Sequence, residues 1–179
     1  MQISGSGDLV SRMKGAAMLD GATYESIERD TNATTQAFLV VVIASVASGI
    51  GAIRGDGGAG LIGGALGSVA AWIIFSISIY WVGTKLIPAP TTQADSGQVL
   101  RTLGFSYSPG LLAVFGFIPF LGWFAIVIAG VWTFIAGIVA TRHALEMSTV
   151  RALATVLLAL IPAAIVSLLI SAIFGINGL

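Results

Sequence analysis

The stretch ALATVLLALIPAAIVSLLISAIF, residues 152–174, decides the class of this protein. It contains no charged side chain, and as an α-helix it would be about 34 Å long, enough to cross a hydrocarbon core of about 30 Å. Four more apolar stretches precede it, so the five run approximately over residues 38–53, 59–84, 99–118, 120–141 and 152–174. The sequence therefore predicts an all-α, polytopic membrane protein with five transmembrane helices.

The composition agrees with a membrane protein and excludes several other classes. Only 9% of the 179 residues are charged, whereas a soluble domain carries about 25%. The mean hydropathy is +0.99. Cysteine is absent, which excludes disulfides, thiolate metal sites and cysteine nucleophiles. The formal net charge is zero, which argues against nucleic acid as a partner.

The basic residues fall on one side of the five stretches. With a cytoplasmic N-terminus, only Arg54 lies outside, and the other seven lie inside: Arg12, Lys14, Arg29, Lys85, Arg101, Arg142 and Arg151. This imbalance is what the positive-inside rule describes. If the first stretch is treated as a loop instead, the same eight residues divide four to four. We therefore expect five spans, with the N-terminus in the cytoplasm and the C-terminus outside.

The chain divides into a cytoplasmic N-terminal segment, residues 1–37, and a five-span membrane domain, residues 38–179. The helix of the first span is expected to begin before the apolar stretch and to cover residues 31–53. Within the segment, the helical spacing of Leu9, Met13, Ala16 and Ala17 predicts a short interfacial helix. A frayed chain end is the alternative. A second short helix is expected over residues 23–29.

Small residues predict close packing between the first two spans. The short turn over residues 54–58 makes these spans an antiparallel hairpin. Small side chains then face one another, with Ala44 and Ser48 on the first span and Gly60, Gly63 and Gly67 on the second. A four-residue spacing of glycines lets two helix backbones approach closely. This face packs either within the chain or against a protein partner in the membrane.

The third stretch is expected to break at Pro109. Proline cannot donate a backbone hydrogen bond, and its ring crowds the preceding helical turn. We therefore expect a kink or helix break around residues 105–110.

The sequence offers little that could carry catalysis. The central parts of the five stretches contain no ionisable residue, so proton relays and voltage sensing lack their usual groups. Residues 58–63 match the GxGxxG pattern, but no βαβ unit surrounds it. His143, the single histidine, suits the C-terminal end of a helix; ligation of a haem-type macrocycle is the alternative. We expect no enzyme activity, no metal site and no cofactor.

Several short motifs resemble those of a known family. They are the run YESIERDTNATTQA (24–37), RTLGFSYSP (101–109), Trp132 in the fourth stretch and STVRAL (148–153). Together with five spans they resemble the prokaryotic branch of the Yip family, whose eukaryotic relatives were named for interacting with Rab-type GTPases. The resemblance implies a polytopic helical protein with its N-terminus inside. It supplies no catalytic residues.

Three functions follow as hypotheses. The first is a non-catalytic scaffold or adaptor of a prokaryotic plasma membrane, in contact with lipids and with protein partners at its cytoplasmic face. The second is an accessory subunit of a larger energy-transducing or photosynthetic complex. The third is a small transporter or pore that uses the break near Pro109. The third predicts a hydrated cavity reached by Ser106, Tyr107 and Ser108, and a structure with these groups packed dry would exclude it.

Overall fold

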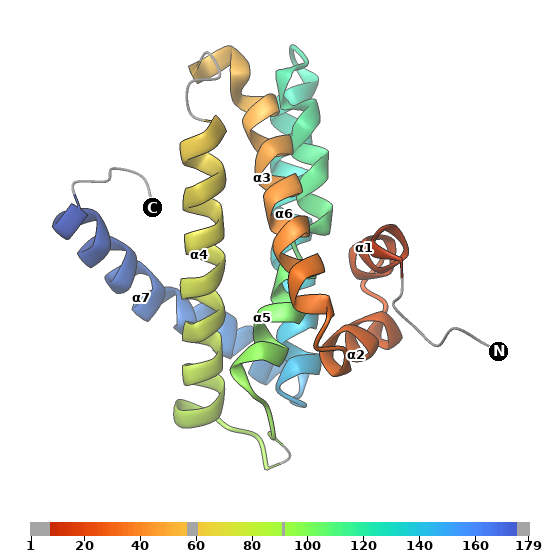
Figure 1. Ribbon diagram of the computed structural model, residues 1–179, viewed down its shortest axis with the longest axis vertical. Coiled ribbons are helices and arrows are strands. Elements are labelled where there is room, and N and C mark those ends of the chain that lie inside the picture. The colour runs from red at the N-terminus through yellow and green to blue at the C-terminus, as the bar shows by residue number, and fades with distance from the viewer. Residues whose placement is uncertain (1–7, 57–60, 91, 175–179) are drawn as a thin grey trace.

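The computed structural model describes residues 8–56, 61–90 and 92–174, and within these ranges every regular element is a helix (Figure 1). The elements in chain order are α1 (Leu9–Ala17), α2 (Gly21–Arg29), α3 (Ala33–Asp56), α4 (Leu61–Trp81), the π-helix η1 (Val82–Leu86), α5 (Ser96–Phe105), the 3₁₀-helix η2 (Ser108–Phe117), α6 (Leu121–Ala144) and α7 (Thr149–Phe174).

Four segments are long and apolar enough to cross a membrane. They are Ala33–Ala52, Ala65–Leu86, Leu121–Ala144 and Thr149–Leu169. Their charged residues, Lys85, Arg142 and Arg151, each lie beside an end of a segment. The prediction of an all-helical membrane protein is thus confirmed, with four such helices among the described residues. The second segment ends as a π-helix, which continues α4 past Trp81 to Leu86.

The third predicted span consists of two shorter helices. The α-helix α5 ends at Phe105, and after a turn at Ser106 and Tyr107 the chain continues as η2. Pro109 occupies the start of η2, where its missing N–H interrupts no helical hydrogen bond. A 3₁₀-helix of ten residues is long for its type. It is accommodated because η2 packs along both α3 and α6.

Glycines allow η2 to lie this close to its neighbours. A Cβ added at Gly51 of α3 would collide with the carbonyl oxygen of Ala113 in η2. A Cβ at Gly122 of α6 would likewise collide with the carbonyl oxygen of Gly116. The backbones of the three helices are therefore in direct contact, and any added side chain would separate them.

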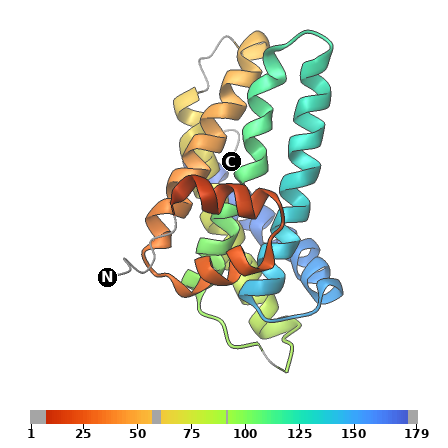
Figure 2. The same ribbon diagram turned by 90° about the vertical axis from the view of Figure 1, so that its right-hand side faces the viewer.

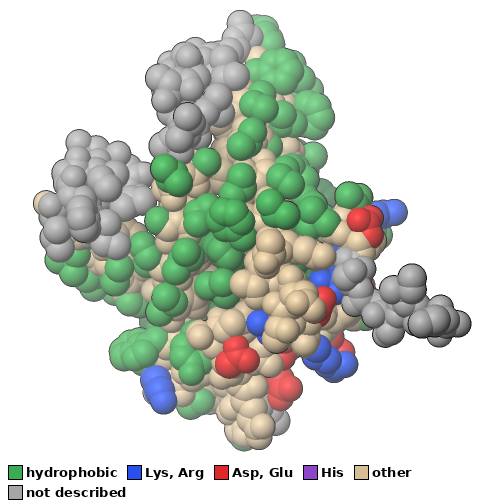
Figure 3. Space-filling model, in the orientation of Figure 1, with side chains coloured by type: hydrophobic (Ala, Val, Ile, Leu, Met, Phe, Trp, Pro, Cys, Tyr) green, Lys and Arg blue, Asp and Glu red, His purple; other side chains and the backbone are tan. Residues whose placement is uncertain are grey.

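Charge divides the molecule into two ends. At one end α3, α5 and α7 begin and α4 and α6 finish, and we call this the charged end. Figure 3 shows apolar side chains over the upper part of the molecule, and the charged side chains near this lower end and beside α1. From the charged end, α7 crosses obliquely away from the other long helices (Figure 1). The helix α1 lies across η2 and α6, and α2 lies against α5 and α6 (Figure 2).

Candidate functional site: the N-terminal helices on the charged end

Arg12 holds α1 against the start of the first long helix. Its side chain is buried, with 6% of the residue exposed. The guanidinium donates through Nη2 to Asp30 Oδ2 at 2.7 Å and through Nη1 to Gln36 Oε1 at 3.0 Å. Asp30 also accepts from the backbone N–H of Asn32. The Arg12 hydrogen bond is the main reason that the pKa of Asp30 lies below its ordinary value. One residue thus ties α1 to both the α2–α3 turn and α3.

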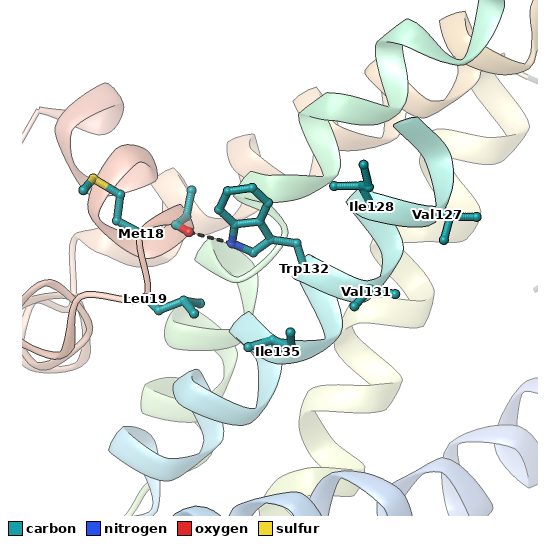
Figure 4. Close-up of a pocket in the computed structure, with 8 residues that line it drawn as sticks. Met18, Leu19, Val127, Ile128, Val131, Trp132 and Ile135 are labelled. Carbon is teal, nitrogen blue, oxygen red and sulfur yellow. Dashed lines mark hydrogen bonds between the residues drawn. The ribbon is translucent and has the colours of Figure 1, made fainter. Parts of the chain in front are cut away.

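Trp132 anchors the other end of α1. Its indole Nε1 donates to the carbonyl oxygen of Ala17 at 2.8 Å (Figure 4). An apolar cavity of about 450 Å³ lies beside this bond, between Met18 and Leu19 on one side and the α6 face around Val131 on the other. Because the carbonyl of Ala17 belongs to the last turn of α1, the bond caps a carbonyl that no later residue of α1 can reach.

Tyr24 fixes α2 to the bundle. Its side chain is fully buried, and its hydroxyl lies 3.2 Å from the carbonyl oxygen of Ala16 and 3.4 Å from that of Ala136. Its ring stacks on His143, with ring centroids 6.1 Å apart. Burial raises the pKa of the Tyr24 hydroxyl, which keeps it neutral and able to donate. Ile27, one turn later, is also fully buried.

Arg101 supports α2 from below. The side chain comes from α5, is 6% exposed, and donates through Nη2 to the carbonyl oxygen of Glu28 at 2.6 Å. This carbonyl lies in the last turn of α2, where a cation also complements the helix dipole. Burial is the main cause that raises the pKa of the Glu28 carboxyl, followed by the charge of Glu146. Arg12 of α1 and Arg101 of α5 are thus two buried cations at the contact between the N-terminal helices and the other helices.

The outward side of α1, α2 and the following turn carries exposed polar side chains, which we call the N-terminal outer face. Its members are Lys14, Asp20, Glu25, Ser26, Arg29, Thr31 and Asn32. Glu25 and Arg29 form a loose ion pair at 3.5 Å, with 51% and 78% of their side chains exposed. Such a pair contributes little to stability, so both groups are available to a partner.

The small residues predicted as a packing interface lie in different surroundings. Ala44 is buried, and a Cβ placed on Gly110 of η2 would lie 3.6 Å from its methyl group. Ser48 is exposed and Gly67 is partly buried. Gly63 lies in the first turn of α4. Gly60 lies outside the described residues, and so do parts of the GxGxxG match and of the predicted turn. Of the predicted interface residues, Ala44 is thus the one that is buried on the side of η2.

The polar residues around the predicted break are mostly packed. Ser106 and Ser108 are buried, and their hydroxyls donate to the carbonyl oxygens of Leu103 and Phe105. Tyr107 alone of the three lines cavities. His143 lies beneath α2, with Nδ1 3.9 Å from Glu25 Oε1. Among the described residues, no three His, Asp or Glu side chains come together as a metal site requires.

Sequence reasoning missed the burial of Arg12 and its ion pair with Asp30. The apolar spacing of α1 placed Arg12 on its polar side, whereas the structure buries Arg12 together with Ala16. The four-residue separation of these two residues was the available signal, because it puts them on one helix face. No sequence pattern identifies Asp30 as the partner, since it lies 18 positions further along the chain.

The model of the Yip1 domain family matches residues 20–172. The chain belongs to this family. The match begins at the N-cap of α2 and ends within α7, so it includes α2, Arg101 and Trp132. No curated protein and no solved structure gives a significant match to the chain. With four apolar helices, this Yip1-domain protein is a multi-pass membrane protein whose helices contact lipid.

Proposed function

We propose that this Yip1-domain protein is a non-catalytic scaffold or adaptor of a prokaryotic plasma membrane, and that its interaction surface is the N-terminal outer face, directed to the cytoplasm. A single observation carries the proposal: side chains from α5 and α6 hold α1 and α2 in place from beneath. A surface that is fixed before binding loses less conformational entropy when a partner binds.

The position of the surface relative to the membrane is supported by charge and by length. The seven basic residues assigned to the cytoplasm by the positive-inside rule include Arg12, Lys14 and Arg29 of the N-terminal helices. The helices α5 and η2 have ten residues each, so they measure about 15 Å and about 20 Å. Placed end to end, they reach about 35 Å, which is enough for the third of five crossings.

The bonds that hold α1 and α2 in place are made by buried groups, because Arg12, Tyr24 and Arg101 are buried. Glu25 and Arg29 are exposed and form only a loose ion pair with each other. The N-terminal outer face therefore carries exposed charges of both signs. Rim charges of this kind set the choice of partner and the rate of association. The face therefore suits a soluble protein partner with a complementary pattern of charges.

Site-specific photo-crosslinking in cells tests this function. A photoreactive amino acid is placed at Ser26 or Arg29 on the N-terminal outer face, and control positions are Phe124 and Ile128, exposed residues of the apolar part of α6. We expect discrete protein adducts from the first pair that disappear when Glu25→Arg is added. The proposal is wrong if adducts form only at the α6 positions.

The structure gives less support to the other two hypotheses, a transporter or pore and an accessory subunit of a larger complex. A transporter that uses the break near Pro109 needs a hydrated path, but Ser106 and Ser108 are buried and bonded to backbone carbonyls. An accessory subunit would offer a packing face of small residues, but Ala44 of that face is buried within the chain.

A further inference from the structure

Two adjoining cavities lie beside the turn between α5 and η2. The first has a volume of about 300 Å³ and lies among α3, α4, η2 and α6. The second has a volume of about 580 Å³ and lies between α4 and α7. Tyr107 is a wall of both. The other walls belong to the helices α3, α4, η2, α6 and α7.

The first cavity is lined by hydroxyl groups. Its walls include Ser45, Ser48, Ser68, Tyr107 and Thr133. Thr133 Oγ1 is buried and has no hydrogen-bond partner. The Tyr107 hydroxyl makes no hydrogen bond with another described residue. An unpaired polar group is costly in an apolar environment, so the hydroxyls of Thr133 and Tyr107 favour a ligand that both donates and accepts hydrogen bonds.

The second cavity is open at the surface, because Leu160 and Leu168 in its walls are 48% and 68% exposed. Its walls are mainly apolar and include Ala71, Phe75, Ala163 and Ala164, with hydroxyl groups from Tyr107 and Ser167. Apolar walls of this kind favour an apolar ligand.

We propose that the two cavities together bind an uncharged lipid with a hydroxyl-bearing head, of the acylglycerol class, whose head lies against Tyr107 and Thr133 and whose chain lies between α4 and α7. No basic side chain is among the cavity walls in the described part of the chain, and a phosphate buried without a counter-charge is costly.

The proposal is tested with the full-length protein in phosphatidylcholine vesicles that contain a diacylglycerol with a photoreactive group in its acyl chain. We expect adducts on η2 or α7, and competition by dioleoylglycerol but not by dioleoylphosphatidylglycerol. Tyr107→Phe should lower the apparent affinity about fivefold, the size of one neutral hydrogen bond. Ala164→Phe, which fills the apolar cavity, should abolish the adducts.

The matched control is Tyr80→Phe, the same chemical change on α4 at a side chain that lines neither cavity. It should leave the adducts unchanged, and thermal unfolding of each variant checks that it is folded. Equal competition by the anionic phospholipid would overturn the proposal. So would adducts that are insensitive to both Tyr107→Phe and Ala164→Phe, or the absence of adducts on folded wild-type protein.

Discussion

At the scale of single residues, Arg12 is the contact that keeps α1 on the bundle. Arg12→Met retains the apolar stem of the side chain but removes the hydrogen bonds to Asp30 and Gln36. Charge-assisted bonds of this kind contribute about 1.5–3 kcal/mol, so amides of α1 should exchange with solvent roughly tenfold faster or more. Lys14→Met, at an exposed position of the same helix, is the control. Equal exchange rates in the two variants would contradict this role of Arg12.

The same pair makes the docking of α1 depend on pH. Arg12 holds the pKa of Asp30 below its ordinary value of 3.8, so the carboxylate stays charged longer when α1 is docked than when it is free. The stabilisation is therefore complete above pH 3.8 and is lost as the pH falls through the lowered pKa. Fluorescence of Trp132, in a chain whose other tryptophans are replaced by phenylalanine, should change below pH 3.8. In the Asp30→Asn variant, the fluorescence of Trp132 should no longer change below pH 3.8.

At the scale of elements, the contact of η2 with α3 depends on the absence of a side chain. Gly51→Ala introduces a Cβ where the carbonyl oxygen of Ala113 lies, and such overpacking costs about 1–3 kcal/mol. The midpoint of thermal unfolding in detergent should fall by roughly 2–12 °C. Gly130→Ala is the control, because a Cβ there meets nothing within 4 Å. It should leave the midpoint unchanged or raise it, since alanine favours a helix. Equal losses in both variants would refute the close contact.

The sequence predicts the long helices better than it predicts what joins them. Runs without charge identify α3, α4, α6 and α7, because a helix long enough to cross a membrane needs little more than apolar length. Pro109 indicates an interruption of the third stretch, but the 3₁₀-helix η2 packs against α3 through Gly51, which is distant in sequence. The sequence pattern of α1 places Arg12 on a solvated face. In the structure the α2–α3 turn places Asp30 beside Arg12, and the pair is largely buried.

At the scale of the whole molecule, the path of the chain decides which surface a cytoplasmic partner can reach. If α5 and η2 together cross the membrane, the loop before α5 and the turn after η2 lie on opposite sides. The chain has no cysteine, so single cysteines report each position without background. Ala94→Cys lies just before α5, and Phe120→Cys replaces a residue that is 96% exposed between η2 and α6.

In intact cells a membrane-impermeant maleimide should label Phe120→Cys and leave Ala94→Cys unlabelled until the membrane is opened. Arg29→Cys on the N-terminal outer face should behave as Ala94→Cys does, because an even number of crossings then separates α2 from the loop before α5. Labelling of Ala94→Cys and Phe120→Cys from the same side would show that α5 and η2 do not cross. The α6–α7 turn would then lie on the opposite side from that loop, although the Thr92 hydroxyl donates to the carbonyl oxygen of Leu145 at 2.9 Å. Because this hydrogen bond requires Thr92 and Leu145 to lie on the same side of the membrane, it favours the five-span path that the basic residues predict.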